Sequence, residues 1–188
     1  MNLINNLRRR AGNHALASDL TRQHRTKRNC SLTNASSIGL LYYLADEATY
    51  HIIEAFIQTL NENRKKVRLI CYTEAKLIPH YFIPKLAQDV LTVKDLNWFH
   101  KPTRSFVKEF ISEEFDLLID LSLNDYFPLH YIAAMSAASL KVGRFEEDQT
   151  DHYDLMIHAS PDTNLNEFIS QIDHYLNMLN QKPDGQQI

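Results

Sequence analysis

Residues 115–123 read FDLLIDLSL, and this stretch decides the fold class. A short, nearly continuous apolar run is typical of a strand that is covered on both faces of a parallel sheet. Alternation along the strand places one set of side chains on one face: Leu117, Ile119, Leu121 and Leu123. The opposite face then carries Leu118, Asp120 and Ser122. A carboxylate inside such a strand is costly unless it is hydrogen-bonded or close to the open end of the sheet.

Outward from this strand, apolar runs alternate with segments of helical period. Further strands are expected at residues 38–44, 67–72, 90–93, 140–145 and 153–157. Helices are expected near residues 49–64, after Thr103, and after Asn124 or Asp125, either of which can cap a helix that holds Pro128 in its first turn. The last helix has the clearest period, formed by Leu165, Phe168, Ile169, Ile172, Leu176 and Leu179, and Asn164 with Glu167 resembles a capping box.

This alternation predicts an α/β fold, because strands that alternate with helices form right-handed βαβ units and a parallel sheet. We expect a single three-layer Rossmann-like domain with a mostly parallel sheet of about six strands over residues 37–181. A basic arm and linker (residues 1–36) precede it, and a tail (residues 182–188) follows. The last two expected strands are joined by a short acidic connection, so they could pair parallel or antiparallel, and a mixed α+β sheet stays open.

Length and composition fit one globular domain: 188 residues, 44% hydrophobic and 23% charged. No apolar run approaches the roughly 20 residues that span a bilayer. The two cysteines, Cys30 and Cys71, suffice for neither a disulfide framework nor a zinc site, which favours a reducing, cytoplasmic location. Cys71 lies within an apolar run and is expected to be a buried, inert thiol.

Charge is unevenly distributed along the chain. Residues 1–28 hold seven basic side chains and one acidic side chain, a net charge of +6, so the remainder of a chain of net charge −3 carries −9. The basic residues are Arg8, Arg9, Arg10, Arg22, Arg25, Lys27 and Arg28. Such an arm suggests a polyanionic partner, a merely solvated segment, or an organelle-targeting signal. Residues 25–37 are polar and non-periodic, which indicates a linker.

Nucleotide-binding and catalytic motifs are missing from the sequence. No G-x-G-x-x-G or G-x-x-x-x-G-K-[ST] motif occurs, and the first expected strand is followed by Asp46 and Glu47, whose carboxylates would repel phosphates. No nucleophile elbow and no compact metal-ligand spacing is present. We therefore expect no cofactor and no metal.

Six polar residues are candidates for a crevice, because open α/β sheets bind ligands beyond the carboxyl ends of their strands. They are Asp46, Asp120, Ser122, Asn124, Asp125 and His130. A small polar pocket is one interpretation. The favoured alternative is that Asp120 and Ser122 only satisfy loop amides, and that Asn124 or Asp125 only caps the following helix, as such residues commonly do in strand-to-helix turns.

A second candidate is the loop that holds Trp98, Phe99 and His100 beside Lys101. If exposed, these rings could stack on a base or anchor a partner protein. Alternatively, the single tryptophan is buried in the core at an edge of the sheet, and this is the favoured expectation.

Four segments carry a resemblance to known proteins: DLNWFHKP (residues 95–102), FDLLIDLSLNDYFPLHYIAAMSAASLKVGRF (115–145), YDLMI (153–157) and IDHYLNML (172–179). They resemble an uncharacterised family of small bacterial proteins, mostly from Bacteroidota, and the likeness runs from about Ile38 to Leu179. The resemblance implies a cytoplasmic bacterial protein with a Rossmann-like body. Residues 115–121 and 141–145 are also similar to the amino-terminal half of lipopolysaccharide heptosyltransferases. Those enzymes need a second Rossmann domain for the nucleotide sugar, so transferase activity is not expected here.

The sequence favours a non-catalytic binding module whose basic arm contacts RNA or a ribonucleoprotein. Two alternatives are a sugar- or nucleotide-ligand enzyme that uses the crevice, and an adaptor or scaffold protein that uses the Trp98 loop.

Overall fold

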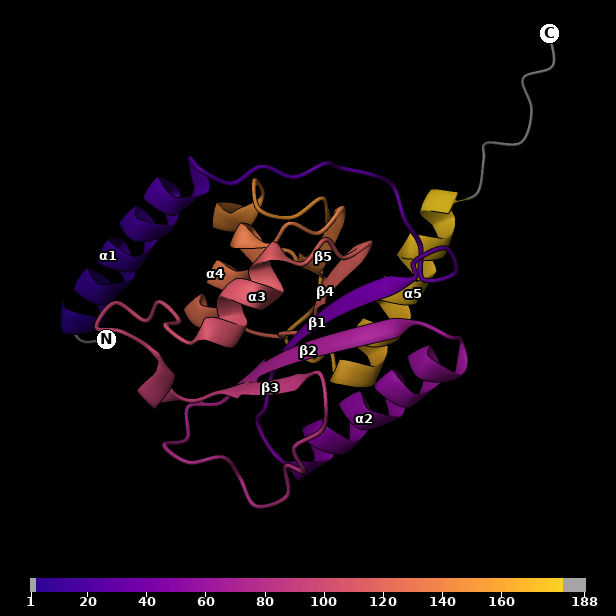
Figure 1. The fold of residues 1–188 in the computed structure, drawn as a ribbon, viewed down its shortest axis with the longest axis horizontal. Coiled ribbons are helices and arrows are strands. Elements are labelled where there is room, and N and C mark those ends of the chain that lie inside the picture. The colour runs from indigo at the N-terminus through magenta and orange to yellow at the C-terminus, as the bar shows by residue number, and fades with distance from the viewer. Residues whose placement is uncertain (1–2, 181–188) are drawn as a thin grey trace, which may run out of the picture.

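The computed structural model describes residues 3–180, so the expected tail at 182–188 lies outside the described residues. Its centre is one six-stranded sheet of order β3-β2-β1-β4-β5-β6, in which every pair of neighbours is parallel. The strands are β1 (Ser37–Tyr43), β2 (Lys66–Tyr72), β3 (Gln88–Leu91), β4 (Leu117–Asp120), β5 (Leu140–Arg144) and β6 (Leu155–Ile157). The predicted three-layer α/β fold is confirmed (Figure 1).

Helices cover both faces of this sheet. They are α1 (Leu3–Leu20), α2 (Glu47–Glu62), α3 (Ser105–Ser112), α4 (Phe127–Met135) and α5 (Leu165–Asn180). One core joins α2 and α5 to the sheet face that presents Leu117, Ile119 and Leu121, and a second core joins α3 and α4 to the face that presents Leu118. The alternation predicted for residues 117–123 is therefore the one the structure adopts.

Strand order explains where a ligand crevice would be expected. From β1 the chain moves outward to β2 and β3, and then returns across the sheet to β4, beside β1. The carboxyl ends of β1 and β4 thus form the topological switch point, where α/β sheets commonly bind ligands. β5 and β6 pair in parallel, with Val142 opposite Leu155. The last two strands, whose relative direction the sequence left open, are therefore parallel, and the alternative of a mixed sheet is excluded.

The amino-terminal segment packs against the body. α1 lies along α4, and its Leu16 is buried with Tyr131 and Ala134. The prediction that residues 25–37 form a linker is wrong, because Cys30, Ser31 and Ala35 are buried and the segment crosses the body as a strap. The strap can be polar because its side chains form hydrogen bonds with carboxylates and backbone carbonyl oxygens of the body.

No helix in residues 3–180 is long and apolar enough to cross a membrane.

Candidate functional site

The crevice predicted at the carboxyl end of β4 exists as a small polar cavity. Five of the six predicted residues line it, namely Asp120, Ser122, Asn124, Asp125 and His130. Tyr126, Arg144, Glu146, Gln149 and Tyr153 complete the lining. Tyr126 directly follows Asp125 in the chain. The other four come from β5 and the connection after it, which reach the cavity only through tertiary packing, so the sequence did not single them out.

Asp120 is the most enclosed group of this cavity, with 6% of its surface exposed. Its Oδ2 accepts a hydrogen bond from the Tyr153 hydroxyl at 2.7 Å, and its Oδ1 accepts one from the Ser122 backbone N–H at 3.0 Å. Burial raises the pKa of Asp120 above its usual range, because the charged form loses hydration. The same burial, together with the adjacent carboxylate, raises the pKa of Tyr153 well above its usual value.

Two histidines meet beside the cavity. His130 Nε2 lies 2.7 Å from His152 Nδ1, so one ring donates a hydrogen bond to the other. Burial, reinforced by the second imidazole, lowers the pKa of His130 to about 4. His152 lies in the acidic connection between β5 and β6, and no local pattern marked it as a partner for His130.

The cavity is too small for a cofactor. Its volume is about 20 Å³, which is room for about one water molecule. The switch point itself holds aromatic side chains. The rings of Tyr43 and Tyr126 stack with centroids 3.9 Å apart, and Tyr72 meets Tyr126 edge-on. In this conformation the crevice therefore admits water but no organic ligand.

One prediction about the crevice and one about capping need correction. Asp46 does not line the cavity, because its carboxylate accepts a hydrogen bond from the Thr49 N–H at 2.7 Å and caps α2. Asn124 and Asp125 do not cap α4, which begins after Tyr126 with no side-chain cap. Asp125 instead accepts a hydrogen bond from Gln149 and forms an ion pair with Arg9.

The body holds most of the arm's cations. Arg25 forms two hydrogen bonds of 2.7 and 2.6 Å to Asp154, whose ion pair with Lys27 spans 2.9 Å. Arg28 lies 3.8 Å from Asp116 and donates to Ser139 Oγ. Although burial opposes it, hydrogen bonding to Arg25 and Lys27 keeps the pKa of Asp154 below its usual range.

The remaining basic residues of the arm differ in their surroundings. The Arg8 guanidinium lies 5.9 Å from the Trp98 ring centroid. Arg10 and Arg22 are exposed, and within residues 3–180 neither has an ion pair. The charge asymmetry of the sequence is therefore largely an internal attraction between arm and body.

Trp98 is exposed over 54% of its surface, so the favoured expectation of a buried tryptophan is wrong. Phe99 and His100 are half-buried under α1, where the Phe99 carbonyl oxygen would lie 2.9 Å from a Cβ added at Gly12. The arm thus covers part of this loop and leaves one face of the indole accessible.

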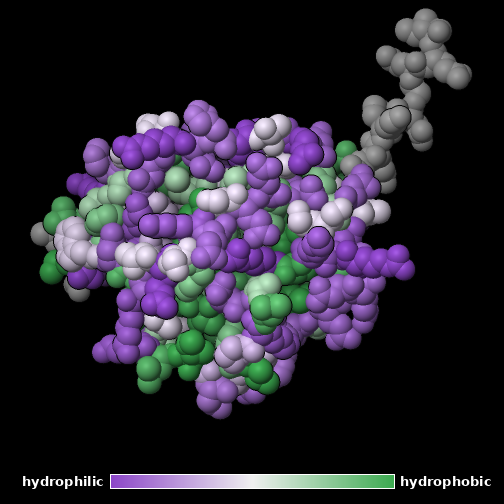
Figure 2. Space-filling model, viewed as in Figure 1, coloured by the Kyte–Doolittle hydropathy of each residue, from purple (hydrophilic) through white to green (hydrophobic). Residues whose placement is uncertain are grey.

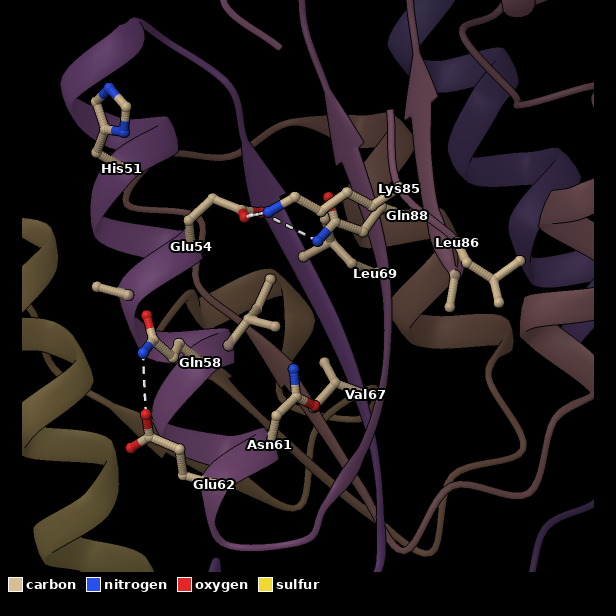
Figure 3. A pocket seen from close by; sticks show the side chains of 13 residues that line it. His51, Glu54, Gln58, Asn61, Glu62, Val67, Leu69, Lys85, Leu86 and Gln88 are labelled. Atoms are coloured by element: carbon tan, nitrogen blue, oxygen red, sulfur yellow. Dashed lines mark hydrogen bonds and ion pairs between the residues drawn. The ribbon is translucent and has the colours of Figure 1, made fainter. Parts of the chain in front are cut away.

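A much larger hollow lies elsewhere, between α2 and the β2–β3 edge of the sheet (Figure 3). Its volume is about 680 Å³, and Val67 and Leu69 lie in its floor. Glu54 crosses it to Lys85 and Gln88, as the dashed lines in Figure 3 show. A second groove of about 530 Å³ shares Val67, Leu86 and Ala87 with the first, so the two flank the same edge of the sheet.

Beside these grooves, the connection between β2 and β3 exposes four large apolar side chains. Leu77, Ile78, Ile83 and Leu86 form what we term the β2–β3 loop patch, and Leu86 is 99% exposed. Figure 2 shows hydrophobic side chains gathered at the lower edge of the molecule, where Figure 1 places this connection. Sequence reasoning did not select these residues, because Pro79 and Pro84 left room for a short helix at most in this stretch and no motif marked it.

No group of three or more His, Cys, Asp or Glu side chains within residues 3–180 is placed to hold a metal ion. Cys71 is buried in β2, where burial raises the pKa of its thiol to about 12.

Fold and site together define a Rossmann-like α/β protein whose crevice is closed. The chain belongs to a family of unknown function (DUF6913), whose model matches residues 8–179 and so includes most of α1. No curated protein matches the sequence.

Among solved structures, the chain is similar to a family 9 glycosyl transferase from Veillonella parvula, with 12% identity and a TM-score of 0.50 over 85% of this chain and 45% of that one. It is also similar to the E. coli heptosyltransferase WaaC, solved with ADP, with 15% identity and a TM-score of 0.42 over 79% and 49% of the two chains. The chain spans about half the length of these proteins. At such low identity the likeness to the glycosyl transferase shows the fold alone.

Proposed function

We propose that this protein is a non-catalytic adaptor, which binds another protein through the β2–β3 loop patch and the two grooves beside it. The single observation that carries the proposal is the patch itself, four large apolar side chains exposed on one connection. Exposed apolar clusters on soluble domains commonly mark interaction surfaces, and an apolar anchor beside a groove is typical of them.

The charge of the grooves indicates the chemistry of the partner. Five carboxylates and three Lys or Arg side chains line the two grooves. A partner surface that presents apolar side chains surrounded by basic residues would complement this arrangement, because opposite potentials favour encounter and register.

The closed crevice supports a non-catalytic role, since its space accommodates a single water. Polyanion binding by the arm, favoured from the sequence, has less support. Arg9, Arg25, Lys27 and Arg28 already contact carboxylates of the body, which leaves Arg10 and Arg22 as exposed cations without an ion pair among the described residues.

Substitutions on the patch test the proposal. Full-length protein carrying Leu77→Ser and Leu86→Ser is compared, after isolation from its host cells, with wild type and with Met178→Ser. Met178 is a matched control because it is 52% exposed on α5. We expect one protein to copurify in stoichiometric amount with wild type and with the control. This association should persist after nuclease treatment. With purified components, the double substitution should weaken its binding at least tenfold, about 1.4 kcal/mol.

Three outcomes would contradict the adaptor role. They are equal retention of the partner by the double variant, absence of any stoichiometric protein, and retention that nuclease abolishes. The last result, combined with loss of binding in Arg10→Ala/Arg22→Ala, would favour the polyanion hypothesis instead.

A further inference from the structure

The sheet has an open edge at the start of β2. Among the described residues, the ladder from β2 to β3 begins only at Leu69, opposite Gln88, so residues 66–68 have no strand on their outer side. The Leu69 N–H donates to the Ala87 carbonyl oxygen at 2.9 Å. Around Ala87 the chain forms a turn, in which the Gln88 N–H donates to the Lys85 carbonyl oxygen at 3.2 Å. β3 therefore starts too late to cover the beginning of β2.

Within this open edge, the backbone N–H and C=O of Val67 point outward. Backbone groups of successive residues in a parallel strand face its two neighbours in turn. The Lys66 N–H donates towards β1, to the Ser36 carbonyl oxygen at 2.8 Å, whereas the Leu69 N–H faces β3. Val67 faces the same side as Leu69, and residues 85–87 supply no backbone hydrogen bond to it. Its unpaired groups form a template to which an extended segment can pair.

A groove adjoins Val67 on each face of the sheet. The hollow of about 680 Å³ beside α2, which we term the α2-side groove, has Val67 and Leu69 in its floor (Figure 3). The hollow of about 530 Å³, which we term the α3-side groove, is lined by Arg68 and by Phe106 of α3. Consecutive side chains of a strand point to opposite faces. A segment beside Val67 would therefore place its side chains alternately in the two grooves.

The α2-side groove suits an apolar side chain. Ile57 of α2 joins Val67 and Leu69 in its lining. The Glu54 carboxylate that crosses the groove forms an ion pair with Lys85, so its charge is neutralised. An apolar side chain placed over this floor removes apolar surface from water on both partners, which favours association.

The α3-side groove is acidic and suits a basic side chain. Three carboxylates surround the Arg68 guanidinium there, namely Glu113 at 3.0 Å, Glu109 at 3.4 Å and Asp89 at 3.7 Å. Lys66 is the other cation in the lining, so three carboxylates face two cations. The Glu109 side chain is 65% exposed, which leaves it accessible to an ammonium or guanidinium group of a partner.

From these features we propose that the partner of the β2–β3 loop patch contributes an extended segment, which adds to the open edge of β2 as a short strand. Its backbone pairs with the N–H and C=O of Val67, one apolar side chain enters the α2-side groove, and an adjacent basic side chain enters the α3-side groove. Leu86 belongs to the patch and lines both grooves, so patch and edge form one continuous surface. Strand addition of this kind combines backbone hydrogen bonds with pockets for alternate side chains. The inference rests on the adaptor role and specifies the chemistry of the partner.

Synthetic peptides test the pairing on the full-length protein. The probe is the blocked peptide Ser-Val-Lys-Val-Lys-Ser, in which apolar and basic side chains alternate. The rearranged peptide Ser-Val-Val-Lys-Lys-Ser has the same composition without the alternation, and a third peptide carries N-methyl groups on the four central amides of the probe. We expect calorimetry to show that the probe binds at least tenfold more tightly than either control peptide, because only the probe offers both the backbone donors and the side-chain pattern.

A pair of protein variants tests the acidic groove. Glu109→Gln removes one carboxylate from the α3-side groove, whereas Glu114→Gln removes the same charge from an exposed residue outside both grooves. Glu109→Gln should weaken binding of the probe about threefold, the effect of one exposed ion pair. Glu114→Gln should bind it as wild type does.

Amide exchange in wild type locates the pairing on the sheet. The probe should slow hydrogen exchange of the Val67 N–H, which faces the open edge. The Arg68 N–H faces β1 and should keep the exchange rate of the free protein.

Equal affinities of the three peptides would overturn strand addition, and so would unchanged exchange at Val67 or equal binding by the two glutamate variants. If Leu77→Ser with Leu86→Ser loses a copurifying protein while the three peptides bind equally, the adaptor role stands and strand addition fails. If the probe binds and protects Val67 but no protein copurifies, the edge of β2 accepts a strand and the adaptor role fails.

Discussion

At the scale of single residues, a glycine in β5 shapes the candidate site. A Cβ at Gly143 would lie 2.6 Å from the Tyr153 ring, so only glycine lets this ring lie against β5 and carry its hydroxyl to Asp120. The same enclosed region buries His130 against His152. Burial, which lowers the pKa of His130, makes the neutral imidazole part of the native state.

His130 should make stability depend on pH. Its folded-state pKa of about 4 lies below the unfolded value of 6.5, so the unfolded chain binds more protons between these values. Besides burial, His152 and Arg9 lower this pKa, whereas Asp125 and Asp148 raise it. Stability is therefore lost as pH falls from about 6.5 towards 4, by up to about 3 kcal/mol. Urea unfolding of His130→Gln should show a shallower loss than wild type over this range. His158→Gln, at an exposed histidine, should follow wild type, and identical slopes for all three proteins would contradict the assignment.

At the scale of elements, local signals specify some helix ends and leave others undefined. α5 begins with the predicted capping box, in which Asn164 Oδ1 accepts from the Glu167 N–H at 3.0 Å and Glu167 accepts from the Asn164 N–H at 3.2 Å. α3 and α4 begin without any side-chain cap. Packing of their apolar residues against the sheet sets these two helices instead, as tertiary contacts commonly do.

The inner face of α5 should be essential for folding. Ile172 is 1% exposed, whereas Tyr175, one turn further on, is 44% exposed. Ile172→Asp places an unpaired carboxylate in the core and should lower the free energy of unfolding by about 4 kcal/mol or more. Tyr175→Asp should change it by about 1 kcal/mol at most. Thermal and urea unfolding measure both, and similar losses for the two variants would refute the packing of α5 on the sheet.

At the scale of the whole molecule, charge attaches the amino-terminal segment to the body. Arg25 donates to Asp154 and to the carbonyl oxygens of Ala138 and Ser139, which follow the carboxyl end of α4. The basic arm and the acidic body are thus two halves of one folded unit.

Loss of this attachment should destabilise the protein. Arg25 and Asp154 side chains are each 11% exposed, so Arg25→Ala leaves Asp154 with only Lys27 and the Lys141 N–H. We expect the free energy of unfolding to fall by about 2 kcal/mol, less than for a buried pair with no other partner. Arg10→Ala should change it by less than about 0.5 kcal/mol. Limited proteolysis within residues 21–29 should quicken only in Arg25→Ala. Equal behaviour of the two variants would show that the strap contributes nothing to stability.

The amino-acid sequence by itself determined the order of the strands and helices of the body, a mostly parallel sheet and the face on which each residue of the 117–123 stretch lies. These properties follow from local periodicity and from the two-residue alternation of a strand, which neighbours in the chain encode. Five of the six residues predicted for the crevice line it, half of its ten lining residues, because they lie at or just after the end of one strand.

Only the tertiary structure decided how large the crevice is, which acids pair with the arm, and that His152 meets His130. Asp46 is a different case, because its hydrogen bond from the Thr49 N–H joins residues only three apart and makes it the N-cap of α2, a local signal that the crevice prediction passed over. Ion pairs such as Arg25 with Asp154 join residues far apart in the chain, and the volume of a cavity depends on how rings such as Tyr43 and Tyr126 pack. Such contacts form only when distant segments come together, so no local pattern records them.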